Sequence, residues 1–148
     1  DAPSAISRLL ELGVPHYLIK ATVLGVMAQR LVRTLCPHCK APLTLGEEDW
    51  QTLTRPWQAP LPNNAHRAIG CLECRDTGYR GRAGVYEIMQ LTDSVKALIT
   101  PDTDLLAIRR QAFKEGMRSL RLSGAQKVAA GLTTIEEVLR VTPQSEQK

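Results

Sequence analysis

The sequence has few aromatic residues and no long apolar run. Among 148 residues there are one Phe, three Tyr and two Trp, so a core must be built from Leu, Val, Ile and Ala. No apolar stretch is long enough to cross a membrane, and no charged-then-apolar leader opens the chain. We therefore expect neither a membrane-spanning nor a secreted protein, and the expected location is cytoplasmic.

Motifs of several enzyme classes are also missing. There is no G-x-x-x-x-G-K-[ST] phosphate loop, no predicted strand ending in acidic metal ligands and no G-x-S-x-G elbow. The net charge is +4, and the basic residues are spread along the chain without a block of like charge. A nucleic-acid binder would carry a clustered basic face with interleaved aromatics. We predict that this chain alone is not an enzyme and binds no nucleic acid.

Four cysteines are the strongest signal in the sequence. They form two C-x-x-C pairs, Cys36 with Cys39 and Cys71 with Cys74. Each pair can direct two sulfurs at one centre, and four thiolates complete the tetrahedral shell of a structural Zn²⁺ site. Such a site is closed to water, so the predicted zinc has a scaffolding role. Binding one Zn²⁺ through four thiolates would lower the net charge to about +2.

Two other uses of the cysteines remain open at this point. They could form two disulfides, or serve redox chemistry, although a thioredoxin-like site needs one C-x-x-C beside a βαβ pattern. On the zinc interpretation, four thiolates and one Zn²⁺ together leave a local charge of −2. We expect Arg33, Lys40 and Arg75 to neutralise this charge and orient the sulfurs, and His38 to be a surface residue.

The remaining pattern predicts many short helices and two strands. Two helices before a single strand cannot complete a sheet, so the amino-terminal end should be the last part of a larger α/β domain.

Trp50 and Trp57 should pack the insert between the cysteine pairs. A capping box at Thr134–Glu137 should open the last helix, and the helices after Thr92 should form a compact bundle. The expected helices span about 1–13, 16–24, 47–53, 93–99, 104–115, 119–130 and 135–142, the expected strands 26–33 and 85–89, and residues 144–148 should fray.

Residues 76–84 form a second informative stretch, with three glycines and two arginines. Arg80 and Arg82 could bind a phosphate or a carboxylate of a neighbour. The alternative is a glycine-rich turn with solvated arginines.

Several stretches together resemble one protein family. Residues 28–39, 71–87 and 131–142, with Gly116-Met117, are similar to signatures of the type II secretion ATPases, or general secretion pathway protein E family. These ATPases are close relatives of the type IV pilus assembly ATPases. Residues 1–5 resemble the helix that follows the family's histidine box. One departure is Ser123-Gly124, where the family often has an acidic residue before the glycine.

The resemblance implies a fold and three domains. Residues 1–35 would be the α/β end of a RecA-like motor core, 36–84 a small tetracysteine zinc-binding subdomain and 85–148 a short α-helical bundle. The family's tetracysteine motif, which binds zinc, matches Cys36, Cys39, Cys71 and Cys74. The phosphate loop, acidic boxes and histidine box have no counterpart here and would lie upstream of Asp1. The chain would then be a carboxy-terminal fragment, inactive alone.

The resemblance also implies a function. The full-length protein would be a homohexameric, cytoplasmic ATPase, peripheral at the inner membrane through platform proteins. It would hydrolyse ATP with Mg²⁺ to drive pseudopilus assembly and protein secretion. Arg30, Arg80 and Arg82 are candidates for nucleotide or inter-subunit contacts, because guanidinium groups stabilise a transferring phosphoryl group. The zinc subdomain is a candidate for binding the platform.

Two alternatives to this function are a type IV pilus assembly ATPase fragment and a stand-alone zinc-ribbon module that binds nucleic acid. The run at residues 31–36 favours secretion over the pilus.

Overall fold

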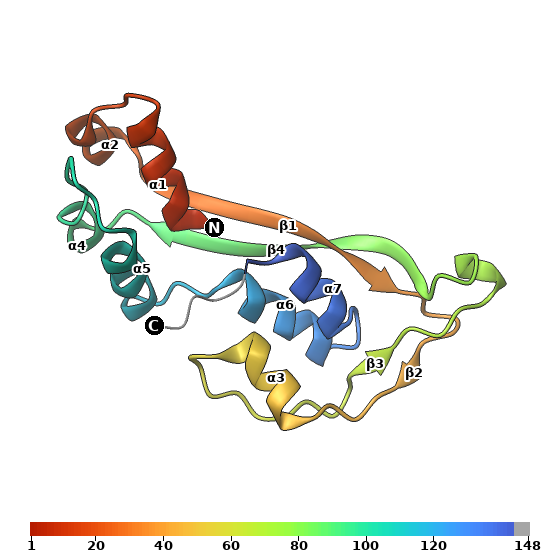
Figure 1. Cartoon of the computed structure of the whole chain (residues 1–148). Coiled ribbons are helices and arrows are strands. Elements are labelled where there is room, and N and C mark those ends of the chain that lie inside the picture. Colours follow the sequence, from red (N-terminus) through yellow and green to blue (C-terminus); the bar gives the residue numbers. More distant parts are fainter. Residues whose placement is uncertain (144–148) are drawn as a thin grey trace. The chain divides into compact units, whose positions relative to one another are not determined.

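The computed structural model describes residues 1–143, which form a mixed α/β structure (Figure 1). The residues pack into two units. Unit 1 contains Asp1–Ala28 and Tyr86–Ser119, and unit 2 contains Gln29–Val85 and the chain from Leu120 onward. Each unit thus combines two separate stretches of chain, whereas the three predicted domains are consecutive. The limits of those domains stay a prediction.

Unit 1 is a set of helices around an apolar core. Its helices are α1 (Ala2–Glu11), α2 (His16–Thr22), α4 (Asp93–Lys96) and α5 (Leu105–Lys114), and α5 packs against α1 and α4. Asp1 caps α1, because its carboxylate accepts a hydrogen bond from the Ser4 amide at 3.0 Å. The fully buried residues of this core include Ile6, Ile19, Met89, Val95, Ile99 and Ile108.

Two long strands pair with each other, β1 (Gly25–Leu35) and β4 (Tyr79–Gln90). Their arrows point in opposite directions in Figure 1. Both strands are longer than predicted. The glycine- and arginine-rich stretch is largely strand rather than turn, because β4 already begins at Tyr79, where the Cys36 amide donates to the Gly78 carbonyl at 3.0 Å.

Unit 2 has a small sheet and three helices. Strands β2 (Ala41–Pro42) and β3 (His66–Arg67) pair antiparallel, and the short 3₁₀ helix η1 (Leu72–Cys74) follows. Helix α3 (Glu47–Thr54) packs against both α6 (Leu120–Ala129) and α7 (Ile135–Val141). Trp50 is buried and donates to the Ala59 carbonyl at 3.2 Å, whereas Trp57 is half-buried. The insert between the cysteine pairs therefore contributes to the core of unit 2.

The helices after β4 differ from the predicted bundle. Helices α4 and α5 belong to unit 1, and α6 and α7 belong to unit 2. Thr92, Asp104 and Thr134 cap α4, α5 and α7, because each side chain accepts a hydrogen bond from a first-turn amide. The cap at Thr134 is as predicted. A capping box also needs the Glu137 carboxylate to accept a hydrogen bond from the Thr134 amide. That part of the prediction is wrong, because the Glu137 carboxylate binds two arginines instead. The predicted fraying at 144–148 lies outside the described residues.

No helix among residues 1–143 combines the length and the apolar character needed to cross a bilayer.

The contact between α6 and α7 depends on Gly124. A Cβ at this position would lie 2.4 Å from one methyl of Val138 and 2.7 Å from the other. Both residues are buried, so the two helices approach closely only because Gly124 has no side chain. This packing gives a structural reason for the glycine in the Ser123-Gly124 pair.

We expect Gly124→Ala to destabilise unit 2 by about 1–3 kcal/mol, because overpacking a close helix contact forces the backbone apart. Thermal and urea unfolding would measure this loss. In a Val138→Ala background the clashing methyls are gone, so Gly124→Ala should cost much less. An equal cost in both backgrounds would show that this contact does not explain the glycine.

Candidate metal centre

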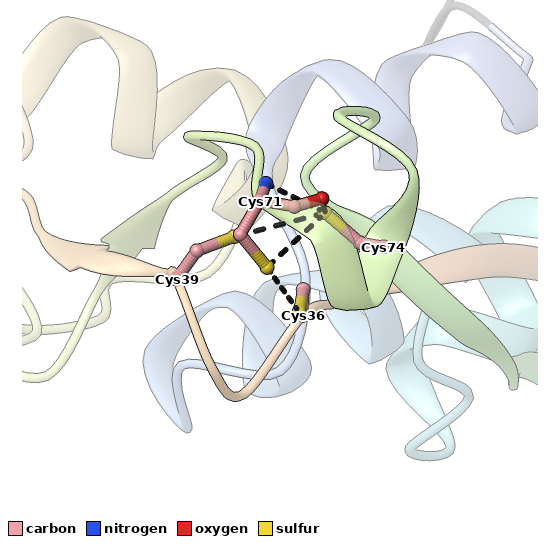
Figure 2. A group of neighbouring side chains, drawn as sticks. All are labelled: Cys36, Cys39, Cys71 and Cys74. Carbon is pink, nitrogen blue, oxygen red and sulfur yellow. Dashed lines mark hydrogen bonds between the residues drawn. The ribbon is translucent and has the colours of Figure 1, made fainter.

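The four cysteine side chains converge on one point (Figure 2). Their sulfur atoms all lie within 4.8 Å of one another. Cys36 and Cys39 come from the turn after β1, and Cys71 and Cys74 come from η1 and the residue before it. Cys36 and Cys74 are buried, while Cys39 and Cys71 are half-buried. Folding thus brings together two pairs that lie more than thirty residues apart.

The spacing of the sulfurs fits a tetrahedral metal ion. The Sγ–Sγ distances are 3.8 Å for Cys36–Cys71, Cys39–Cys74 and Cys71–Cys74. A Zn–S bond of about 2.3 Å in tetrahedral geometry places sulfurs about 3.8 Å apart. A disulfide would need a separation of about 2.05 Å, and all four cysteines are free. The donor set therefore suits Zn²⁺, and the two-disulfide alternative does not describe this structure.

Backbone amides donate hydrogen bonds to two of the four sulfurs, those of Cys39 and Cys74. The Cys74 sulfur accepts hydrogen bonds from the amides of Cys71 and Gly78, both at 3.2 Å. The Cys39 sulfur accepts one from the Gly70 amide at 3.3 Å. Amide donors stabilise thiolate charge and fix the direction of each sulfur. Backbone amides around the second cysteine pair thus stabilise negative charge on the Cys39 and Cys74 sulfurs.

The predicted roles of the nearby basic residues are therefore wrong in part. Arg33 pairs with Glu137, and the Lys40 ammonium donates to the Gly131 carbonyl at 2.8 Å. Arg75 has a left-handed backbone, with φ +55°, at the end of η1. Adjacency in sequence placed these residues near the ligands, but longer-range partners take up the side chains of Arg33 and Lys40.

Gly78 is required by the geometry of the second knuckle. Its φ is +80°, and a Cβ would lie 2.6 Å from the Cβ of Ala68. Because no side chain intervenes, its amide reaches the Cys74 sulfur while its carbonyl accepts from the Cys36 amide. Gly78 thereby ties the second cysteine pair to the end of β1.

The protonation of the thiols in the absence of a metal is uneven. Burial alone would raise the pKa of the Cys74 thiol, but the amides of Cys71 and Gly78 lower it to about 6. Burial raises the pKa of the Cys39 thiol to about 11. The Cys74 thiol therefore ionises near neutral pH and the Cys39 thiol does not, so a bound cation would be needed to hold Cys39 as a thiolate.

Within residues 1–143, the four cysteines are the group of His, Cys, Asp and Glu side chains arranged to hold a metal ion. His38 lies in the first knuckle but is exposed and not among them, as predicted. The sequence thus pointed to the same four candidate ligands that the structure brings together among residues 1–143.

Comparisons with known proteins place this fold and site in a family. A family model described as "Type II/IV secretion system protein" matches residues 1–140. The chain belongs to the type II/IV secretion system protein family. The family resemblance predicted from the sequence is therefore confirmed.

Relatives of two kinds are similar to this chain. The type IV pilus assembly ATPase TfpB of Acinetobacter baylyi is 46% identical over 143 residues, covering 97% of this chain and 24% of the relative. The type II secretion system protein E of Pseudomonas aeruginosa is 44% identical, covering 96% and 28%. The type II secretion system ATPase E of Vibrio cholerae is 39% identical, covering 97% and 28%. The chain thus spans about a quarter of the length of these relatives.

The three candidate arginines lie on the two long strands, Arg30 on β1 and Arg80 and Arg82 on β4. The Arg30 guanidinium donates to the Gln29 carbonyl at 2.8 Å, and Arg80 lies 3.7 Å from the Glu73 carboxylate. Arg82 is exposed on β4. All three are exposed, so they remain predictions for contacts with a nucleotide or a neighbouring subunit of this secretion family protein.

Sequence reasoning missed Glu137, which is only 2% exposed. Its carboxylate accepts hydrogen bonds from the Arg33 amide at 2.8 Å, from the Arg33 guanidinium at 2.7 and 2.9 Å, and from the Arg140 guanidinium at 2.9 and 3.1 Å. The only signal in the sequence was the acidic pair in a predicted capping box, which suggests a purely local role. The partner Arg33 is 104 residues away.

The environment of Glu137 keeps its carboxylate ionised. Burial alone would raise the pKa of this carboxyl, but hydrogen bonds from Arg140 and Arg33 lower it from 4.5 to about 2. Because the folded-state pKa is depressed, the stabilisation is complete above about pH 4.5 and is lost as the pH falls toward 2. At neutral pH Glu137 is therefore a buried anion held by two arginines.

We expect the purified protein to contain about one Zn²⁺ per chain, and Cys36→Ser or Cys71→Ser to remove it, because three thiolates no longer close the shell. Elemental mass spectrometry would measure the metal content. His38→Ala, in the same knuckle, is the matched control and should keep the metal. Wild-type protein that carries no metal and is unaffected by chelators in its thermal unfolding would contradict the zinc assignment.

Proposed function

We propose that this chain is the carboxy-terminal part of a secretion ATPase, which hydrolyses ATP to drive pseudopilus assembly and type II protein secretion. The match of residues 1–140 to the type II/IV secretion family carries this proposal. The names of the relatives from Pseudomonas aeruginosa and Vibrio cholerae support it, because one is a secretion protein and the other a secretion ATPase.

The ATP-hydrolysing residues would lie in the part of the protein that this chain does not contain. The 148 residues include no phosphate loop, and they cover about a quarter of each relative. ATP and Mg²⁺ would thus be bound mainly by upstream residues of a RecA-like core. On this proposal the chain alone is inactive.

The surface of unit 1 supports the proposal of a larger core. Leu24, just before β1, is 86% exposed, and Met27 of β1 and Ile88 of β4 are 60% and 57% exposed. Exposed apolar residues near one another are typical of a surface that is covered by other protein. A pair of strands is also only marginally stable by itself. We propose that the upstream motor core covers this part of β1 and β4.

The metal centre would act as a scaffold. Cys36, Cys39, Cys71 and Cys74 would hold Zn²⁺, which supplies cross-linking and charge neutralisation but no open coordination position. The amides of Gly70, Cys71 and Gly78 orient the thiolates. The site thereby fixes the end of β1 against the start of β4.

The assembled protein would be a cytoplasmic homohexamer, attached to the inner membrane through platform proteins and without a nucleic-acid partner. Arg30, Arg80 and Arg82 would make inter-subunit or nucleotide contacts in the hexamer, because exposed guanidinium groups can reach carboxylates and phosphates of a neighbour. A type IV pilus assembly ATPase is the second candidate function. It is favoured by the 46% identity to the pilus ATPase of Acinetobacter baylyi.

We expect ATP turnover from the complete protein and none from this chain alone. Cys36→Ser should abolish or strongly reduce turnover in the complete protein, because the metal scaffold is lost, while His38→Ala should retain it. Steady-state phosphate release under conditions that preserve hexamers would measure both. Absence of turnover from the complete protein with its platform partners would overturn the ATPase proposal.

We also expect the insert at 40–70 to bind the platform, so that its deletion abolishes binding. Because α3 of the insert packs against α6 and α7, point substitutions are a gentler test. Leu61→Glu and Ile69→Glu change exposed apolar residues of the insert, and Leu106→Glu is a control of similar exposure in unit 1. Co-purification with the inner-membrane platform should fall only for the first two. Equal binding by all three variants and by the deletion would exclude this surface.

A further inference from the structure

One short stretch of the chain contacts both segments that carry the cysteines. This stretch, residues 131–137, joins α6 to α7 and includes the first turn of α7; we call it the α6–α7 clasp. It lies entirely within unit 2, as do all four cysteines.

The clasp binds the segment that leads into and out of the first cysteine pair. The Leu35 amide donates to the Leu132 carbonyl at 2.8 Å, and the Thr133 hydroxyl donates to the Arg33 carbonyl at 2.7 Å. Beyond Cys39, the Lys40 ammonium donates to the Gly131 carbonyl at 2.8 Å. The clasp therefore holds the backbone immediately before Cys36 and the side chain immediately after Cys39.

The clasp also binds the segment that follows the second cysteine pair. The hydroxyls of Tyr79 and Thr134 lie 2.8 Å apart, in hydrogen-bond contact. Tyr79 directly follows Gly78, whose amide donates to the Cys74 sulfur. The Arg33 guanidinium lies over the Tyr79 ring at 4.2 Å. Contacts from both cysteine segments thus meet in one cluster.

Glu137 is the anion at the centre of that cluster. It receives the backbone amide and the guanidinium of Arg33, and it holds Arg33 where the guanidinium stacks on Tyr79. Arg140, from the next turn of α7, forms a second ion pair with the same carboxylate. Glu137 is the buried member of both ion pairs, because the Arg33 and Arg140 side chains are 48% and 57% exposed. Its carboxylate accepts charge-assisted hydrogen bonds from both guanidinium groups and one from the Arg33 amide, and a neutral side chain in its place would weaken them. Loss of the Glu137 charge should therefore release the clasp from β1 and Tyr79 together.

We propose that docking of the α6–α7 clasp and metal binding by the four cysteines are coupled, with Glu137 as a positioning residue for the metal centre. A metal ion cross-links the end of β1 to the start of β4, and the clasp joins the same two segments a few residues away. Metal binding and clasp docking both require the end of β1 and the start of β4 to lie together. Each therefore raises the equilibrium constant of the other by the same factor. This inference rests on the proposal that the cysteines bind zinc.

The first test compares the zinc affinity of Glu137→Gln with that of wild type in the complete protein. Competition with a chromophoric zinc chelator would measure both affinities. We expect Glu137→Gln to bind zinc about tenfold more weakly, within the range typical of coupled sites. Glu87→Gln is the matched control, because Glu87 is also 2% exposed but belongs to unit 1, where it accepts from the Ala2 amide at 2.9 Å. It should leave the zinc affinity unchanged.

The second test reads the reciprocal effect by hydrogen exchange. Removal of zinc by a chelator should increase exchange in peptides covering 131–141 while leaving α1 and α5 unchanged. Thr133→Val, which removes only the hydroxyl that bonds the Arg33 carbonyl, is the milder variant if Glu137→Gln does not fold. It should weaken zinc binding, and Thr133→Ser should restore it.

The outcomes separate this inference from the proposed function. If wild type binds no zinc, the proposed metal site fails. A second outcome would overturn the coupling alone. In that case wild type binds zinc, Glu137→Gln and Thr133→Val bind it as tightly as Glu87→Gln, and hydrogen exchange at 131–141 is the same with and without the metal. The zinc site would then stand without the proposed coupling.

Discussion

The convergence of four cysteine thiols is the constraint on which unit 2 depends. Sulfurs 3.8 Å apart cannot all ionise beside one another without a cation, because like charges at short range repel strongly. With a metal ion, the same arrangement becomes a cross-link between two distant turns. For small zinc domains the free energy of metal binding is on the order of 10–16 kcal/mol, and it contributes directly to folding. On the proposed zinc assignment, the ion would hold these thiols together and contribute to the stability of unit 2.

The surroundings of the sulfurs show how a scaffold can be built mainly from backbone groups. Amides of Gly70, Cys71 and Gly78 point at the thiols, which leaves basic side chains available for other contacts. The side chains of Arg33 and Lys40 instead bind the α6–α7 clasp. The metal centre and the carboxy-terminal helices thereby share one network, and the insert packs on the same helices through α3. A displacement of α7 and a rearrangement of the cysteines would both change the contacts of Arg33 and Lys40.

The family relationship indicates the kind of protein in which this network would act. Members of the type II/IV secretion system family include ATPases for secretion and for pilus assembly. The described chain carries no phosphate loop, so its contribution to a motor is architectural on our proposal. Exposed apolar residues at β1 and β4 of unit 1 and exposed arginines on the same strands are the features through which it would join the rest of such a motor.

Local patterns in the sequence determined much of this protein. The two C-x-x-C pairs identified the candidate ligands, and Asp1, Thr92, Asp104 and Thr134 marked helix starts, because capping and ligand spacing act over three or four residues. The tertiary structure alone decided which helices pack together, where β4 begins and what Glu137 binds. Arg33 and Glu137 are 104 residues apart, and a capping box predicts only contacts within one turn. Short-range spacing cannot encode such a pair, since it forms only when β1 and α7 are already side by side.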